Sequence, residues 1–122
     1  MRKVLAMIVL VLLMQPGIAQ AKEDRSSGNH FRIMCSQAEL GNVNPNYDSG
    51  YCMGFVDGAS QILNAWRGIG EGALVCLPSA VTVGQMVSIF LKYLNNNPER
   101  LHESAAFLFF DAMREVYPCA SE

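Results

Sequence analysis

The sequence predicts an all-α domain: a small bundle of about four helices in two antiparallel hairpins, cross-linked by two disulfides. Apolar residues recur at spacings of three and four in four separate segments, and no segment of useful length alternates apolar and polar residues. The chain has 122 residues and four cysteines, which suits one domain with an even set of thiols. Its 51% hydrophobic and 16% charged residues exclude a disordered chain.

The first 21 residues have the layout of a secretory signal peptide. Arg2 and Lys3 precede an apolar run over residues 4–14, and Ala19 and Ala21 stand at the −3 and −1 positions of a cleavage site. The alternative is a membrane anchor, but an 11-residue helix rises only about 16 Å, against about 30 Å of hydrocarbon. We therefore expect cleavage after Ala21, export to the periplasm and no membrane attachment afterwards.

The mature chain is acidic. Removal of 21 from 122 residues leaves 101, with 7 Lys plus Arg against 11 Asp plus Glu, so the net charge is 7 − 11 = −4. This balance excludes a basic nucleic-acid-binding protein. Residues 22–30 are polar and predict a flexible mature N-terminus, and residues 31–122 form the helical domain.

Export gives the cysteines a structural role. Cys35, Cys52, Cys76 and Cys119 all lie in the mature chain, and an even number in an oxidising compartment predicts two disulfides. A four-cysteine zinc site is an alternative, but no Cys-x-x-Cys pair is present. A catalytic thiol would leave an odd partner. We therefore expect neither a metal nor another cofactor.

Two helices are predicted in the first half of the domain. Residues 31–40 have short helical periodicity, and residues 41–46 form a turn cluster. Asp48 can cap a second helix, which Gly68 can end. The apolar stripe of this second helix, expected to face the core, comprises Cys52, Phe55, Val56, Ala59, Ile62, Leu63 and Trp66.

Two more helices are predicted in the second half. Thr82 and Gln85 form a capping box at the start of a strongly periodic helix that ends at residues 95–97. Asn97 can cap a fourth helix with Pro98 at its first position, and this helix continues to Val116.

The hairpins favour one cysteine pairing. Cys35 and Cys52 lie at similar distances on either side of the first turn, and Cys76 and Cys119 on either side of the second. Antiparallel helices bring such positions together, which favours Cys35–Cys52 and Cys76–Cys119. Four cysteines allow three connectivities, and all three remain open at this point.

No catalytic motif is present, so we do not expect an enzyme. The sequence has no Gly-x-Ser-x-Gly elbow and no His-Glu-x-x-His motif, and its carboxylates are scattered. A hydrolase remains an alternative that only a test of turnover can address.

Two features of the predicted helices are candidate dimer or partner faces. Gly54 and Gly58 fall four apart with Asp57 between them, so another helix or chain could pack closely there; alternatively, Asp57 is a solvated acid. In the fourth helix, large aromatic residues lie on the same face as a charged residue, which indicates a candidate interface. Alternatively, another element of the fold covers these aromatic residues. This second set comprises Phe107, Phe110 and Arg114.

Ordered short motifs resemble the Rap/Tai family of small secreted helical immunity proteins. The likeness covers about residues 35–119, beginning with Tyr51-Cys52-Met53-Gly54-Phe55-Val56-Asp57-Gly58 and ending with Tyr117-Pro118-Cys119. Between these lie Cys76-Leu77-Pro78, Val81-Thr82, Gln85-Met86-Val87, Lys92-Tyr93-Leu94, Pro98-Glu99, Leu101-His102 and Ala105-Ala106.

The resemblance implies a periplasmic, disulfide-bonded protein without catalysis, often a homodimer. Such a protein binds a peptidoglycan amidase effector delivered by type VI secretion and blocks its active-site cleft. An alternative with the same helical domain is a periplasmic chaperone-like or stress protein without a toxin partner. From their expected exposure, the candidate partner-binding residues are Arg67, Ile69, Glu71, Leu74, Asn95, Asn96 and Asn97.

Overall fold

The computed structural model describes residues 24–39, 47–69 and 72–120. The elements are α2 (Gly28–Glu39), α3 (Tyr47–Ile69), α4 (Val83–Asn96), the 3-10 turn η1 (Pro98–Arg100) and α5 (Ala105–Val116). Pairing between extended segments of these ranges is limited to two isolated bridges. The predicted all-α fold is confirmed, whereas the expected signal peptide and the turn at 41–46 lie outside the described residues.

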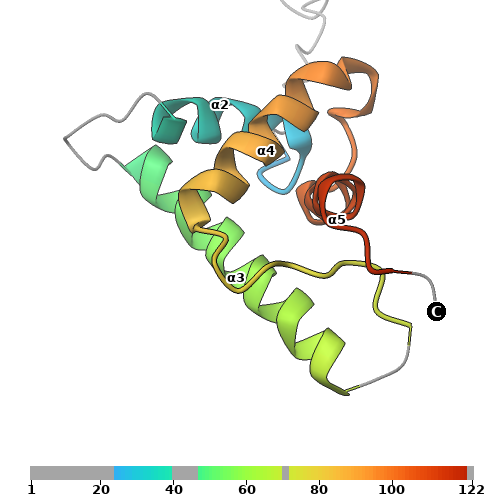
Figure 1. Cartoon of the computed structure of the whole chain (residues 1–122). Coiled ribbons are helices and arrows are strands. Elements are labelled where there is room, and N and C mark those ends of the chain that lie inside the picture. Colours follow the sequence, from blue (N-terminus) through green and yellow to red (C-terminus); the bar gives the residue numbers. More distant parts are fainter. Residues whose placement is uncertain (1–23, 40–46, 70–71, 121–122) are drawn as a thin grey trace, which may run out of the picture.

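The helices pack as two hairpins around one core. α2 lies against α3, α4 crosses both of them, and α5 packs against α4 (Figure 1). Four phenylalanines from the four helices meet at the centre. The ring centroids of Phe31 and Phe55 are 4.2 Å apart, and Phe90 and Phe109 form an edge-to-face pair at 5.4 Å. Such pairs add to the free energy gained from burial alone.

Both predicted disulfides are present with the favoured pairing. Cys35–Cys52 joins α2 to α3 with a Cα–Cα distance of 5.1 Å. Cys76–Cys119 joins the segment before α4 to the chain after α5 with a Cα–Cα distance of 4.9 Å. Each hairpin therefore carries one covalent cross-link.

The capping box at the start of α4 is confirmed. The hydroxyl of Thr82 accepts a hydrogen bond from the Gln85 backbone N–H at 3.2 Å, and the Gln85 side chain accepts one from the Thr82 N–H at 2.9 Å. These bonds satisfy two N–H groups that no helical carbonyl can reach. The predicted inner face of α4 is buried as Met86, Val87, Phe90, Leu91 and Leu94.

The fourth helix begins later than predicted. Pro98 starts only the 3-10 turn η1, and α5 begins at Ala105 after the N-cap Ser104. The cause is competition for backbone groups: the carbonyl of Leu101 accepts from Asn29, and the N–H of Ala105 donates to Ser26. An unbroken helix from Pro98 would have joined Leu101 and Ala105 to each other.

The same bonds correct the prediction that the chain is flexible up to residue 30. α2 begins at Gly28 rather than Phe31, and Ser27 is buried in an isolated bridge with Ser104. The N–H of Gly28 donates to Glu103 O at 2.9 Å. Residues 24–30 are thus part of the packed domain, because backbone groups between η1 and α5 form hydrogen bonds with them.

The apolar stripe predicted for the second helix is buried only in its first half. Cys52 and Val56 are fully buried, but Ile62 and Trp66 are exposed. The reason is length: the 23 residues of α3 span roughly 34 Å, whereas the 14 residues of α4 span roughly 21 Å. The C-terminal end of α3 therefore extends beyond the other helices, as Figure 1 shows.

Candidate functional site

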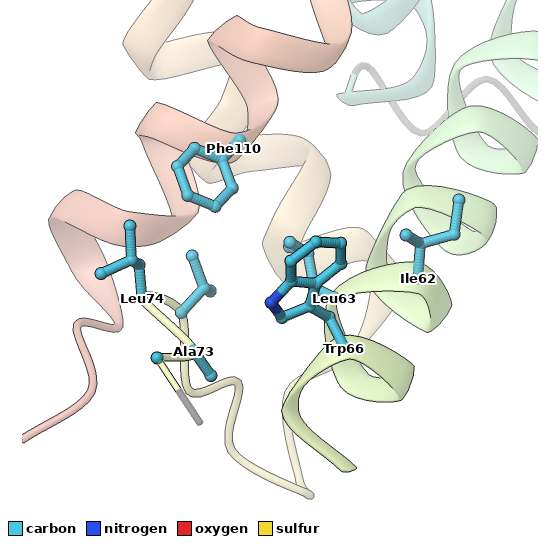
Figure 2. Close-up of a pocket in the computed structure, with 8 residues that line it drawn as sticks. Ile62, Leu63, Trp66, Ala73, Leu74 and Phe110 are labelled. Atoms are coloured by element: carbon cyan, nitrogen blue, oxygen red, sulfur yellow. The ribbon is translucent and has the colours of Figure 1, made fainter. Parts of the chain in front are cut away.

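An apolar pocket of about 310 Å³ lies at this overhanging end of α3. One wall is α3, the second is the segment after it, and the third is α5. Figure 2 shows Trp66 of α3 facing this space, with Phe110 of α5 and Leu74 of the intervening segment on the other side. The lining residues are Ile62, Leu63, Trp66, Gly72, Ala73, Leu74, Val75 and Phe110.

The edge of the pocket is unusually apolar for a surface. Trp66 is 62% exposed, and Ile69 at the end of α3 is 84% exposed. Ile62 and Leu74 are also more than half exposed. Large apolar side chains gathered on one face of a soluble protein mark a site of interaction.

The segment between α3 and α4, which forms one wall of the pocket, is held in place by buried side chains and by backbone pairing. The side chains of Val75 and Leu77 are buried in the core. The N–H of Cys76 donates to Tyr117 O at 2.8 Å, and the N–H of Cys119 donates to Leu74 O at 3.4 Å. The Cys76–Cys119 disulfide closes this short pairing, so the segment is tied to the end of α5.

In the α5 wall, the aromatic ring of Phe110 packs against the charged side chain of Arg114. The guanidinium of Arg114 lies over the Phe110 ring, 5.5 Å from its centre, a favourable cation–π geometry. Arg114 is held there by an ion pair of 3.0 Å with Asp111. The structure therefore brings two of the candidate interface residues, Phe110 and Arg114, together and places Phe110 in the pocket.

A polar cluster next to this wall fixes η1 to α5. The Arg100 guanidinium contacts Glu103 at 2.7 Å and Asp111 at 2.9 Å, and it also donates to the Tyr93 hydroxyl. The hydrogen bond from Arg100 lowers the pKa of Glu103, and the two carboxylates raise the pKa of Arg100. Burial raises the pKa of Tyr93. The cluster is an ion-pair network that holds the start of α5 in place.

The first predicted contact loop lies beside the pocket. Leu74 lines the pocket, whereas Arg67 and Ile69 are exposed in the last turn of α3, and Arg67 Nη1 lies 3.4 Å from Leu77 O. Glu71, also predicted, lies outside the described residues. The structure thus brings three of these four residues to one end of the molecule.

The second predicted contact loop lies elsewhere. Asn95, Asn96 and Asn97 are at the C-terminal end of α4, whereas the pocket segment precedes its N-terminal end. Asn97 ends the helix: its backbone N–H and its side-chain amide both donate to Tyr93 O, at 3.1 and 2.8 Å. The two loops are separated by the length of α4 and cannot form one continuous surface.

The predicted glycine face of α3 is open. Gly54, Asp57 and Gly58 are exposed, and a Cβ added at either glycine would meet nothing within 4 Å. Asp57 accepts a hydrogen bond from the Gln61 side chain at 2.9 Å. Phe107 of α5 is 69% exposed and does not line the pocket, whereas Phe110, one turn further along the same helix, does.

The pocket itself was missed because Ile62, Leu63 and Trp66 continue the period of the buried stripe. Helical periodicity reports which side of a helix is apolar but not how far the neighbouring helices extend. The unequal lengths of the predicted second and third helices were the available clue, because the longer one has more apolar turns than the shorter one can cover.

Mainly apolar side chains line this site, so it is suited to bind another apolar group. Within residues 24–39, 47–69 and 72–120, no three His, Cys, Asp or Glu side chains are grouped to hold a metal ion. In the same part of the chain, no helix combines the length and apolar character needed to cross a bilayer.

Comparison with known proteins identifies the family. No curated protein and no solved structure shows a significant match to the chain. The family described as Rap1a immunity proteins matches residues 27–119, which include the four described α-helices and both disulfides. The chain therefore belongs to the Rap1a immunity protein family.

Proposed function

We propose that this protein is a periplasmic immunity protein that binds a peptidoglycan amidase effector of a type VI secretion system and occludes its active-site cleft. Membership of an immunity family supports a role in neutralising a toxin. The amidase and the mode of inhibition rest on the resemblance of the sequence motifs to the Rap/Tai proteins.

The overhanging end of α3 is the observation that carries the inhibitory contact. Ile62, Trp66 and Ile69 project from a helix whose other half is anchored in the core by Cys52 and Val56. An exposed apolar end on a rigid base loses little conformational entropy when it binds. It can therefore fill part of a cleft and exclude the substrate, while the pocket beside it receives a side chain of the amidase.

The disulfides support the proposed periplasmic location. Disulfides form and persist in oxidising environments such as the bacterial periplasm, and both pairs in this chain are formed. We propose that residues 1–21 direct export and are removed after Ala21, so that the mature protein meets the incoming amidase where peptidoglycan lies.

A homodimer is part of the proposal. The face with Gly54, Asp57 and Gly58 and the side chain of Phe107 are exposed and lie outside the pocket. Two copies could pair through these surfaces and leave the end of α3 accessible. Sedimentation velocity of the mature protein tests this: a single species of monomer mass at micromolar concentration contradicts it.

An inhibition assay tests the main proposal. The mature oxidised protein is mixed with a type VI peptidoglycan amidase encoded beside it, and release of cleaved peptide from purified peptidoglycan is measured. We expect stoichiometric inhibition of that amidase and none of an unrelated amidase. Peptidoglycan cleavage that is unchanged at tenfold excess rejects the proposal, and weak binding to many unfolded proteins instead indicates the chaperone-like alternative.

A further inference from the structure

The two disulfides differ in their surroundings. Cys35 and Cys52 are both 0% exposed, and their bond lies in the core between α2 and α3. Cys76 and Cys119 are both partly exposed, and Cys76 directly follows the pocket-lining residue Val75. Reduction of a disulfide requires a thiolate to reach one of its sulfur atoms, so we expect the second bond to be reduced sooner than the first in the folded protein.

The exposed disulfide fastens a wall of the binding site. Leu74 and Val75 line the pocket, and Cys76 follows them directly. Among the described residues, this segment pairs with the chain after α5 through the hydrogen bonds from Cys76 and Cys119, which together form the isolated bridge between Val75 and Pro118. Without the covalent bond, these two backbone hydrogen bonds, the hydrogen bond from Arg67 to Leu77 O and the buried Val75 and Leu77 side chains would hold the wall.

We propose that the Cys76–Cys119 disulfide is a redox-sensitive fastening that makes the pocket competent to bind only when it is oxidised. The α-helical core is held separately by Cys35–Cys52 and by the central phenylalanines, so it persists when the fastening opens. This inference rests on the proposed function for the identity of the partner, but the fastening itself is independent of it. Binding would then be assembled in an oxidising compartment and lost in a reducing one.

The reaction is thiol–disulfide exchange with a dithiol reductant. One thiolate of the dithiol attacks a sulfur of the bond, forms a mixed disulfide and displaces the other cysteine as a thiolate. The second thiol of the reductant, once deprotonated, then displaces the remaining cysteine. Two electrons pass from the dithiol to the cystine, which takes up two protons, and the products are two cysteine thiols and a cyclic disulfide.

Reduction of the folded mature protein with dithiothreitol tests the order of opening. Aliquots are alkylated over time and mapped by mass spectrometry. We expect Cys76 and Cys119 to be alkylated about tenfold sooner than Cys35 and Cys52, or earlier still, because the exposed bond is more accessible to attack in the folded state. Equal rates, or earlier alkylation of Cys35 and Cys52, would overturn the proposal.

Hydrogen exchange of the same partly reduced protein, with no amidase present, tests the consequence for the wall. We expect faster exchange at the amides of Cys76 and Cys119, with α2 to α5 still protected and the helical circular dichroism unchanged. The C76S/C119S double variant should reproduce this pattern without a reductant. Unchanged exchange at these amides, or a general loss of helix, contradicts a local fastening.

Binding measurements separate this inference from the proposed function. If the oxidised protein inhibits the amidase, C76S/C119S should bind it at least about tenfold more weakly, a loss of about 1.4 kcal/mol. Equal affinity would overturn the inference alone. If the oxidised protein does not inhibit the amidase, the proposed function fails, and the alkylation and exchange results still decide whether the fastening exists.

Discussion

Gly28 and Leu108 lie so close together that a Cβ added at Gly28 would be 2.5 Å from Leu108 Cδ1. The same Cβ would lie 3.2 Å from the backbone Cα and O atoms of Leu101. Leu108 is completely buried, so its side chain has little room to move. This contact seats the first turn of α2 in the angle between η1 and α5.

The close contact predicts that Gly28→Ala destabilises the domain. We expect the free energy of unfolding to fall by about 1–3 kcal/mol, because an extra methyl group in a filled space forces its neighbours to shift. Gly68→Ala is the matched control: Gly68 lies in α3 outside the proposed dimer face, nothing lies within 4 Å of its added Cβ, and alanine in a helix is more stable than glycine by about 0.5–1 kcal/mol. Urea unfolding measures both, and a neutral Gly28→Ala contradicts the packing.

The capping box predicts a second difference in stability. Thr82→Ala removes the side-chain bond to the Gln85 N–H, and loss of such a cap costs about 1 kcal/mol. Ser104, the N-cap of α5, makes no side-chain capping bond, so Ser104→Ala should cost clearly less. Thermal unfolding of the two variants compares them, and an equal loss at both sites would rule out the role assigned to Thr82.

The ion pair of Arg100 and Glu103 predicts a pH-dependent stability. Because the hydrogen bond from Arg100 lowers the pKa of Glu103 below its ordinary value of 4.5, the ionised carboxylate stabilises the folded state above that pH. This contribution is lost as the pH falls from 4.5 through the lower pKa of the folded state. Glu103→Gln should therefore be less stable than the wild type at pH 7, and the gap should narrow at pH 3.

The control for this pH effect is Glu99→Gln. Glu99 is exposed at the start of η1, and the described residues give it no ion pair. Its substitution should leave the urea midpoint unchanged across the same pH range. If the gap between the wild type and Glu103→Gln stays constant from pH 7 to pH 3, the ionised pair is not its cause.

The exposed C-terminal end of α3 predicts which side chain contributes most to the binding free energy. We expect Trp66→Ala to weaken amidase binding by about 2–4 kcal/mol, the range of an aromatic hot spot, with little loss of stability because the side chain projects from the core. Phe107→Ala removes an equally exposed aromatic away from the pocket and should retain tight binding. Titration calorimetry measures both, and retention of full affinity by Trp66→Ala removes the pocket from the mechanism.

Local rules predicted most of the fold. The period of α4, its capping box and the two hairpin cross-links each depend on residues close in sequence or on one symmetric turn, and all are present. The break before α5 was not predictable in this way. It depends on Ser26 and Asn29, about 75 residues away, which bind the backbone groups that a continuous helix would have used.

The positions of the candidate contact residues could be predicted only in part, for the same reason. Exposure of Arg67, Ile69 and Leu74 follows from a glycine-rich connection, which the composition reveals. The exposure of Trp66 depends on where α4 and α5 end relative to α3, a property of the packed molecule rather than of one segment. Residues 95–97 share the polar composition of a contact loop, but Asn97 serves to end a helix.

Because α3 is longer than α4, its two ends have different roles: the first turns pack in the core and the last turns are exposed. Its first turns are constrained by the packed interior, whereas its last turns contact few neighbours and can accept new side chains without disturbing the bundle. Substitutions at the exposed positions of the last turns of α3, such as Ile62, Trp66 and Ile69, could thus redirect the protein toward a different partner at little thermodynamic cost. Recognition can diverge here while the architecture stays the same.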